Sequence, residues 1–370
     1  MHELIFPDYS RNQCAIANEV LKHFGVVHAD SSFGIASQNN KKLSLVLLDG
    51  LGWNLFSELK NSNSFSAAKV TSVFPSTTAT ALASLSSGLT PGEHGIIGYK
   101  AFFKEAGSLI KPLEFTYASS NRDGQLSQMG TLKDMFKINT VFDRLRQKKI
   151  RSTVILPNFI AGSDYSNLIY SGASEILSYK DIWEAFFLYR QELERPRSKF
   201  VHFYIPYIDS IEHVYGHGHE IAKEAASYIF NKIAGITQHN KNVTGIVTSD
   251  HGHIDIEREI DLHRDRGLLK KLELPPYGDG RAPLFKSRQD ITKELSKYNL
   301  HIFDRKAFGL LFGRQNAEIS DMLPDFIGAP LDAKSYAYRY EMVPQKKKHI
   351  LKSNHGGLSK EEMEIPVVIL

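Results

Sequence analysis

Short, continuous apolar runs alternate along this chain with longer segments in which hydrophobic residues recur every three to four positions. The runs predict buried strands, and the periodic segments predict amphipathic helices. Strands that are apolar on both faces and alternate with helices are typical of an α/β fold, with a mostly parallel central sheet covered by helices on both faces. We expect strands at 43–48, 152–156, 200–205 and 243–248, and helices at 11–25, 141–147, 180–193 and 219–238.

Residues 70–88 combine a strand, a turn and a helix in one stretch. An apolar run ends at Pro75, hydroxyl side chains follow at 76–78, and an alanine- and leucine-rich run continues to Gly88. Glycine there is a good helix C-cap. The hydroxyls are therefore expected at the helix N-terminus, where free N–H groups suit a phosphate-like anion and where a hydroxyl nucleophile is well placed. The plainer interpretation is that Ser76 or Thr77 only caps the helix.

The remaining segments are less regular. Residues 100–138 show no clear period, residues 275–280 are expected to form a loop, and residues 282–285 are expected to form a strand. We predict a single domain over residues 1–370. Its core would comprise residues 41–254 and 346–370, with a less regular inserted segment at about 255–345 on the substrate side.

Composition narrows the classes of protein that the chain can be. Of its 370 residues, 42% are hydrophobic and 23% are charged, which is typical of a soluble globular protein with a sizeable core. The formal net charge is only +4, and the one tight basic run, at 346–348, is expected to be a solvated loop, so the chain has no nucleic-acid-binding footprint. Cys14 is the only cysteine, which excludes an intramolecular disulfide and a cysteine zinc site.

The sequence also bears on location. No apolar run approaches the roughly 20 residues needed to span a bilayer. The first nine residues have neither the basic start nor the apolar core of a signal peptide. We therefore expect a cytoplasmic protein with no membrane partner. No pattern in the chain sets its oligomeric state.

Three carboxylates follow directly after predicted strands, namely Asp49, Asp209 and Asp250. Strand carboxyl ends are where α/β sheets build their sites, so neighbouring strands would bring these groups together. Histidines accompany them: His213 lies one helical turn after Asp209, His251 follows Asp250, and His355 lies in a glycine-rich loop.

Aspartate and histidine without cysteine suit zinc or manganese, and two such sets suggest a two-metal site. Each motif alone is weak, because an aspartate after a strand is usually a turn or cap residue. His217, His219 and His253 are interpreted as loop or surface residues rather than ligands.

Taken together, these motifs resemble the alkaline phosphatase superfamily, and within it the nucleotide pyrophosphatase/phosphodiesterase branch. The resemblance covers residues 43–370 and is weakest at 100–138 and 255–345. It is carried by Leu47-Leu48-Asp49-Gly50, Phe74-Pro75-Ser76-Thr77-Thr78, Ser87-Gly88-Leu89-Thr90-Pro91-Gly92-Glu93-His94-Gly95-Ile96, Asp209-Ser210-Ile211-Glu212-His213, Ser249-Asp250-His251-Gly252 and Asn354-His355-Gly356-Gly357.

The resemblance implies a role for each residue. The family's nucleophile lies ten residues before the Gly of its Ser/Thr-Gly-Leu segment, here Gly88, which makes it Thr78, with Thr77 and Thr80 as the neighbouring alternatives. Tyr99 falls where the diesterase branch usually has an asparagine that hydrogen-bonds a phosphate oxygen, and it is the candidate substrate-binding residue. The implied cofactors are two divalent metal ions, zinc or else manganese. One would be held by Asp49, Asp250, His251 and Thr78, and the other by Asp209, His213 and His355.

The implied activity is hydrolysis of a phosphodiester or pyrophosphate bond in a small nucleotide-type phosphate ester, through a phosphothreonine intermediate. Two alternatives remain at this point: a phosphomonoesterase on the same core, and a non-catalytic metal-binding member of the fold. A monoesterase would need an arginine for its doubly charged phosphate. Arg281 is the candidate, although a structural role suits it better. A sulfatase is disfavoured because Cys14 lacks the Cys-Xaa-Pro-Xaa-Arg context.

Overall fold

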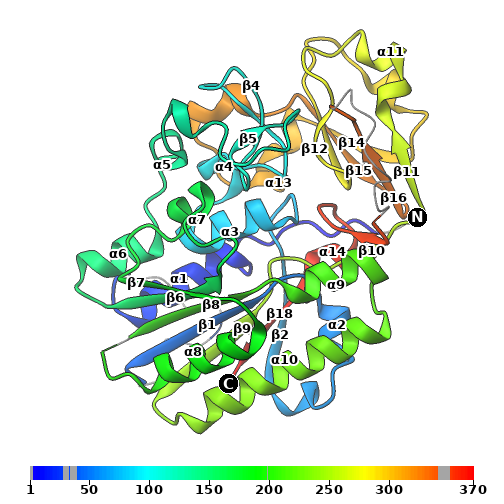
Figure 1. Cartoon of the computed structure of the whole chain (residues 1–370). Coiled ribbons are helices and arrows are strands. Elements are labelled where there is room, and N and C mark those ends of the chain that lie inside the picture. Colours follow the sequence, from blue (N-terminus) through cyan, green and yellow to red (C-terminus); the bar gives the residue numbers. More distant parts are fainter. Residues whose placement is uncertain (1–2, 28–32, 34–39, 198, 341–350) are drawn as a thin grey trace.

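A seven-stranded sheet forms the centre of the computed structural model, which describes residues 3–27, 33, 40–197, 199–340 and 351–370 (Figure 1). Its spatial order is β2-β18-β9-β1-β8-β6-β7. Strands β9, β1, β8, β6 and β7 pair in parallel, whereas β18 is antiparallel to both of its neighbours. The strands are β1 (Lys42–Leu48), β2 (Ser66–Thr71), β6 (Ser152–Pro157), β7 (Glu175–Tyr179), β8 (Phe200–Ile205), β9 (Val243–Thr248) and β18 (Glu364–Ile369).

Helices bury both faces of the central strands, which explains why β1, β6, β8 and β9 are buried along their whole length. Along β1, Leu43, Leu45 and Leu47 belong to one hydrophobic cluster, while Val46 and Leu48 belong to the other. Successive strand side chains point to opposite faces, so a strand covered on both sides has no face that alternates as polar towards solvent. The first cluster includes α1 (Gln13–His23), α3 (Thr78–Ser87), α6 (Val141–Gln147) and α7 (Asp164–Ile169), and the second includes α2 (Trp53–Ser57), α8 (Ile182–Glu194) and α10 (Glu220–His239).

Smaller sheets form a separate group, in the upper half of Figure 1. A four-stranded antiparallel sheet has the order β12-β13-β15-β14, and a three-stranded one has the order β3-β4-β5. These strands are β3 (Ala101–Phe103), β4 (Ser108–Lys111), β5 (Thr116–Tyr117), β12 (Tyr277–Asp279), β13 (Ala282–Phe285), β14 (Leu300–Asp304) and β15 (Phe326–Pro330). Short pairs join β10 (Ile254–Asp255) to β17 (Ser353–Asn354), and β11 (Arg258–Asp261) to β16 (Lys334–Ala337).

The remaining helices are mostly short. They are α4 (Pro91–His94), α5 (Leu132–Met135), α9 (Tyr207–Tyr215), α11 (Arg266–Leu269), α12 (Thr292–Leu295), α13 (Phe308–Phe312) and α14 (Lys360–Met363). None of the helices in the described part of the chain combines the length and the apolar character needed to cross a membrane. The basic run at 346–348 lies outside the described residues.

Two local expectations were wrong. The apolar run ending at Pro75 is a strand only as far as Thr71, because Phe74 leaves the sheet and packs on Phe312, with ring centroids 6.0 Å apart. Residues 275–280 are not all loop, because Tyr277–Asp279 pairs antiparallel with Ala282–Phe285. The sequence pattern did not predict this very short strand, because proline and glycine lie around it and these residues usually indicate turns.

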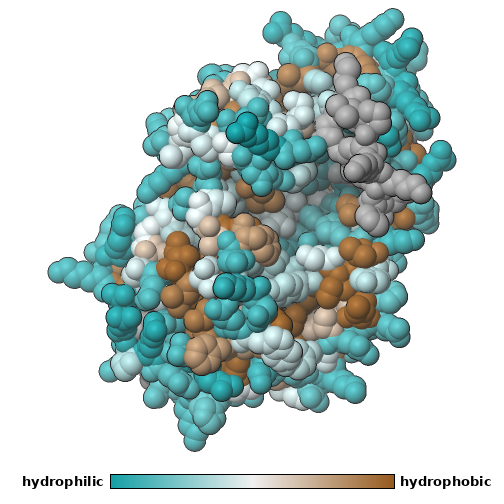
Figure 2. Space-filling view, viewed as in Figure 1, coloured by the Kyte–Doolittle hydropathy of each residue, from teal (hydrophilic) through white to brown (hydrophobic). Residues whose placement is uncertain are grey.

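Hydrophobic side chains also reach the surface around α8 and α10. Trp183 is 64% exposed and Phe187 is 58% exposed, and the Trp183 ring packs edge-on against Tyr228 at 5.7 Å. Figure 2 shows hydrophobic side chains interspersed with hydrophilic ones over this half of the molecule. Interspersed apolar residues of this kind are normal for a protein surface.

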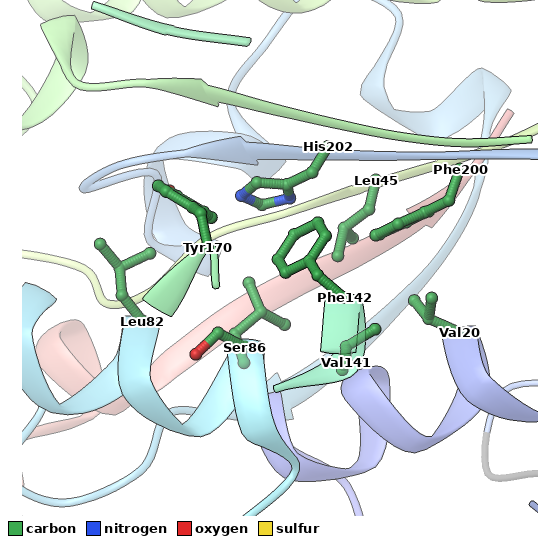
Figure 3. Close-up of a pocket in the computed structure, with 10 residues that line it drawn as sticks. Val20, Leu45, Leu82, Ser86, Val141, Phe142, Tyr170, Phe200 and His202 are labelled. Atoms are coloured by element: carbon green, nitrogen blue, oxygen red, sulfur yellow. The ribbon is translucent and has the colours of Figure 1, made fainter. Parts of the chain in front are cut away.

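A small cavity between α3 and the sheet contains a buried titratable group (Figure 3). His202 is 3% exposed, and its ring faces Tyr170 and Phe142 at 5.5 and 6.1 Å. Burial lowers the pKa of His202 to about 4. His202 therefore stays neutral in the folded protein where an unfolded histidine would already be protonated.

We expect this histidine to destabilise the fold in acid. A depressed folded-state pKa contributes stability that is present above the unfolded value near 6.5 and lost as pH falls towards 4, by about 3 kcal/mol at most. Urea unfolding of chelator-treated protein at pH 7, 5.5 and 4.5 should show wild type losing stability relative to His202→Gln. A difference between the two proteins that does not change with pH would contradict this assignment.

Candidate metal centre

Three neighbouring strands bring the three predicted aspartates together. Strand β1 lies between β9 and β8, and it ends immediately before Asp49. Asp250 follows β9, and Asp209 lies in the first turn of α9, directly after β8. Gly50 has φ of 80°, and a Cβ there would lie 2.8 Å from the Cα of Asp209, so only glycine lets the two chain segments approach this closely.

Asp49 and Asp250 each have one oxygen fixed by hydrogen bonds and one oxygen that accepts none. The Oδ1 of Asp250 accepts from the backbone N–H groups of Gly50 (3.1 Å) and His251 (3.0 Å) and from Ser249 Oγ (3.3 Å). The Oδ2 of Asp49 accepts from the Tyr204 hydroxyl. The other two oxygens, Asp49 Oδ1 and Asp250 Oδ2, are buried without a hydrogen bond. They lie 3.5 and 3.4 Å from Nε2 of His251.

This arrangement is electrostatically incomplete. Burial, together with the charges of Asp250 and Asp209, raises the pKa of Asp49 well above its usual value. Two buried carboxylates at such close range cannot both stay ionised unless a positive charge lies among them. The two oxygens without hydrogen bonds and the ring nitrogen converge, and together they fit a divalent cation.

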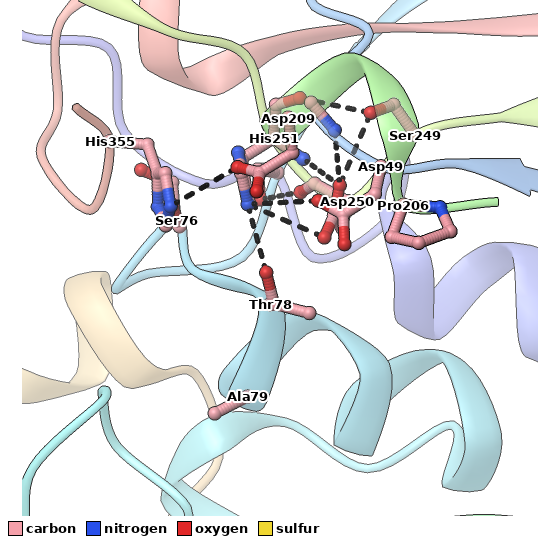
Figure 4. Close-up of polar contacts among 12 residues, drawn as sticks. Asp49, Ser76, Thr78, Ala79, Pro206, Asp209, Ser249, Asp250, His251 and His355 are labelled. Atoms are coloured by element: carbon pink, nitrogen blue, oxygen red, sulfur yellow. Dashed lines mark hydrogen bonds and ion pairs between the residues drawn. The ribbon is translucent and has the colours of Figure 1, made fainter. Parts of the chain in front are cut away.

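Thr78 begins the helix that faces these carboxylates (Figure 4). The preceding residue, Thr77, makes no side-chain capping hydrogen bond, and its hydroxyl instead bonds Asp279. Ser76 donates to the carbonyl of Gly357 at 2.8 Å. Neither hydroxyl caps the helix, so its first N–H groups remain free for an anion. Thr78 Oγ1 lies 3.2 Å from Nε2 of His251. At the other end, Gly88 caps the helix in the left-handed conformation, as expected.

A second group of donors surrounds Asp209. Its Oδ1 lies 3.2 Å from His213 Nε2, 2.9 Å from His253 Nε2 and 3.6 Å from His355 Nε2. Burial alone would raise the pKa of Asp209, but hydrogen bonds from His213 and His253 hold it well below its usual value. Burial and the neighbouring histidines lower the pKa of His355. Asp209 is therefore favoured in its ionised form and His355 in its neutral form, the forms in which these groups bind metal.

Hydrogen bonds at Nδ1 fix the orientation of three predicted histidines. Nδ1 of His213 donates to the carbonyl of Ser353 (2.9 Å), Nδ1 of His355 to the carbonyl of Ser76 (3.1 Å), and Nδ1 of His251 to the carbonyl of Gly252 (3.2 Å). A carbonyl can only accept, so each Nδ1 carries a proton and each ring turns its Nε2 towards the carboxylates. Metal-ligating histidines show this arrangement.

His253 corrects the sequence interpretation. It is not a loop or surface histidine, because it is fully buried and contacts Asp209. Ligand atoms of Asp209, His251, His253 and His355 all lie within 4.8 Å of one another, as do those of Asp49, Asp250 and His251. The sequence held one indication: residues two apart in an extended segment share a face, so His253 lies on the same side as His251. His217 and His219 lie outside these two groups of ligand atoms: His217 contacts Glu212, and His219 caps the N-terminus of α10.

Tyr99 does not offer its hydroxyl proton to this cluster. The hydroxyl donates to Glu114 Oε1 at 2.7 Å, and the backbone N–H donates to the Asp279 carboxylate at 3.2 Å. Burial raises the pKa of Tyr99, so the phenol stays protonated. A phosphate oxygen would therefore have to displace Glu114 to receive that proton.

Arg281 has the structural role that was expected for it. Its guanidinium is fully buried and forms a two-point ion pair with Glu362, at 3.1 and 2.9 Å. It also donates to the backbone carbonyls of Asp332 and Lys334. These four bonds use four of the five N–H groups of the guanidinium, which leaves no pair of N–H groups free to bind a doubly charged phosphate.

The sheet topology, with aspartates and histidines gathered at its strand ends, is that of an alkaline-phosphatase-like fold. A family model described as type I phosphodiesterase/nucleotide pyrophosphatase matches residues 43–270, and the chain belongs to this family. Both findings confirm the resemblance and the fold class predicted from the motifs.

Solved structures share this fold at low sequence identity. Murine ectonucleotide pyrophosphatase/phosphodiesterase 5, an inactive variant in complex with AMP, is 15% identical with a TM-score of 0.65, over 89% of this chain and 87% of that one. The human protein is 14% identical with the same TM-score and coverage. Phosphonoacetate hydrolase from Sinorhizobium meliloti, in complex with phosphonoacetate, is 14% identical with a TM-score of 0.63, over 89% and 90% of the two chains. No curated protein sequence matches the chain.

Proposed function

We propose that this protein is a two-metal hydrolase that cleaves phosphodiester or pyrophosphate bonds of nucleotide-type substrates, with Thr78 as its nucleophile. The observation that carries the proposal is the position of Thr78 Oγ1. It lies at the uncapped N-terminus of α3, 3.2 Å from His251 Nε2, opposite two carboxylate oxygens that lack hydrogen bonds. Family membership and the AMP complex of a protein with this fold support the substrate class.

Two groups of residues would hold the metal ions. Asp49, Asp250, His251 and the Thr78 hydroxyl would hold one, and Asp209, His213 and His355 would hold the other. Their mixture of carboxylate and imidazole suits zinc, and also manganese. When bound, the ions supply positive charge that lowers the pKa of the threonine hydroxyl and offsets charge on the phosphoryl oxygens.

The chain's own groups then perform a double displacement. Thr78 Oγ1 attacks phosphorus in line and forms a phosphothreonine ester as the bond to the leaving alcohol or phosphate breaks, and the proton that Oγ1 gives up departs with that leaving group. The free N–H groups of α3 donate to the phosphoryl oxygens as charge develops on them. Water then attacks the same phosphorus, the bond to Thr78 breaks, and Oγ1 recovers a proton as the product leaves.

Arg281 favours a diester over a monoester. A monoester presents an additional negative charge, and the arginine that would pair with it is already bound to Glu362. We keep Tyr99 as the proposed substrate-binding residue, with Glu114 as the group that a phosphate oxygen would replace.

The preference can be measured directly. We expect metal-loaded protein to hydrolyse thymidine 5′-(4-nitrophenyl phosphate) with kcat/KM on the order of 10- to 100-fold above that for 4-nitrophenyl phosphate, because an unmatched charged hydrogen bond costs about 1.5–3 kcal/mol. A faster reaction with the monoester would favour the phosphomonoesterase alternative. Absence of hydrolysis across both esters, with zinc and with manganese, would favour a non-catalytic metal-binding protein.

A further inference from the structure

We infer that His253 is a fourth protein ligand of the metal ion assigned above to Asp209, His213 and His355, an inference that rests on the two-metal function just proposed. His253 is fully buried, and its Nε2 lies 2.9 Å from Asp209 Oδ1, nearer than that of His213 or His355. Its ring centroid lies 4.8 Å from that of His213 and 5.1 Å from that of His355. The three rings therefore surround one carboxylate oxygen.

The hydrogen bonds of Ser353 determine which nitrogen of His253 carries a proton. Ser353 Oγ donates to the backbone carbonyl of Glu212 at 2.7 Å, which uses the only proton that this hydroxyl has. His253 Nδ1 lies 3.0 Å from the same Oγ, so Nδ1 must be the donor in that bond. His213 Nδ1 donates to the carbonyl of the same serine. One residue, Ser353, thus orients two histidines so that both direct Nε2 towards Asp209.

A neutral His253 therefore has a lone pair at Nε2, 2.9 Å from a carboxylate oxygen. Two lone pairs at this distance repel each other unless a positive centre lies beside them, either a proton on Nε2 or a metal ion. The surroundings attract such a centre: Glu212 Oε2, buried without a hydrogen bond, lies 4.0 Å from His253 Nε2. Ligand atoms of Asp209, His253 and His355 lie within 4.8 Å of one another, so one metal ion would satisfy both rings and the carboxylate, whereas a proton on His253 would satisfy one ring.

This ligand makes the two metal sites chemically different. With His253, the Asp209 site offers one carboxylate and three imidazoles, which suits zinc better than manganese. The Asp49 site offers two carboxylates, one imidazole and a hydroxyl, an oxygen-rich set that manganese also accepts. We therefore expect zinc to fill the Asp209 site first when both metals are present.

Nitrogen NMR of the metal-loaded wild-type protein tests the assignment without relying on activity. In protein labelled with ¹⁵N-histidine, His253 should show a protonated Nδ1 and a metal-bound, unprotonated Nε2 when zinc is added. Ser353→Ala identifies the signals, because it removes the Nδ1 partner of His253 and leaves the carbonyl that holds His213. A proton on Nε2 of His253 in the zinc-loaded protein would overturn the inference.

Metal binding by variants gives a second test. His253→Gln keeps an N–H donor for Asp209 but supplies no ring nitrogen, so a ligand role predicts a zinc dissociation constant raised by more than the 10- to 100-fold expected for a lost outer partner. His355→Ala provides the benchmark for a lost ligand. His217→Gln, which removes a histidine bonded to Glu212 outside the cluster, should bind zinc as wild type does. Zinc affinity of His253→Gln equal to that of His217→Gln would overturn the inference.

The two proposals fail in different ways. If wild type binds two ions and hydrolyses the diester while His253 Nε2 stays protonated, only the ligand assignment fails. If wild type binds fewer than two ions, or binds both and cleaves no phosphate ester, the proposed function fails.

Discussion

Replacing Thr78 with alanine is expected to reduce diester turnover by a factor on the order of 10⁴ or more, because the variant has no hydroxyl to form the phosphothreonine. Metal content should stay near that of wild type, since Asp49, Asp250 and His251 remain to hold the ion. Steady-state kinetics with the thymidine diester, together with elemental analysis of the same sample, measure both quantities.

Neighbouring threonines provide matched controls for this experiment. The Thr77 hydroxyl bonds Asp279, and the Thr80 hydroxyl accepts from the backbone N–H of Gly98. Neither hydroxyl is therefore directed at the metal-site carboxylates that Thr78 faces. Thr77→Ala and Thr80→Ala should each keep at least about a tenth of the activity, and Thr78→Ser should keep more than Thr78→Ala. Full activity in Thr78→Ala, or a larger loss at either neighbour, would show that the nucleophile has been misassigned.

Replacing Asp49 with asparagine is expected to abolish binding of one metal ion while stabilising the metal-free protein. The amide supplies N–H groups beside the Asp250 oxygen that has no hydrogen bond, and removes a buried carboxyl whose pKa is raised. A raised folded-state pKa costs stability as pH rises above the unfolded value near 3.8. At pH 7 the metal-free variant should therefore have a larger free energy of unfolding than wild type, and near pH 4 the two should be equal.

Asp209→Asn serves as the control with the opposite sign. The pKa of Asp209 is held low by His213 and His253, so its carboxylate stabilises the fold above the unfolded pKa, and that stability is lost as pH falls. Asp209→Asn should destabilise the metal-free protein at pH 7, although it too loses one ion. Urea unfolding in the presence of a chelator at pH 4 and 7, with diester kinetics after metal is restored, measures these effects. Activity should fall on the order of 10²- to 10³-fold or more in both variants. Equal destabilisation by the two changes would contradict the electrostatic account of Asp49.

Four strands of the central sheet, β1, β6, β8 and β9, were predictable because they are buried on both faces. Runs such as 43–48 and 243–248 contain no charged residue and are buried at every position, and the helices between them show a clear 3.6-residue period, so both patterns were readable. The segments that failed have no such constraint. Phe74 is apolar because it packs on Phe312 from another part of the chain, and β12 is three residues long, too short for a period of two to be visible.

The site was predictable where it depends on strand order. Asp49, Asp209 and Asp250 each follow an apolar run, and parallel neighbours necessarily bring such residues to one edge of the sheet. His253 depends instead on how the chain leaves β9, and on Ser353, which lies 100 residues away in sequence. Tyr99 depends on Glu114, in a segment without a period. Contacts between irregular segments leave no repeating pattern in the sequence, so these two residues required the structure.

The stereochemical course at phosphorus tests the central claim most directly. A diester made chiral by sulfur substitution at phosphorus can be hydrolysed in isotopically labelled water and the configuration of the product determined. Displacement by Thr78 followed by displacement by water inverts the centre twice, so this account predicts net retention. Net inversion would mean that water attacks the substrate directly, and would contradict a phosphothreonine intermediate at Thr78.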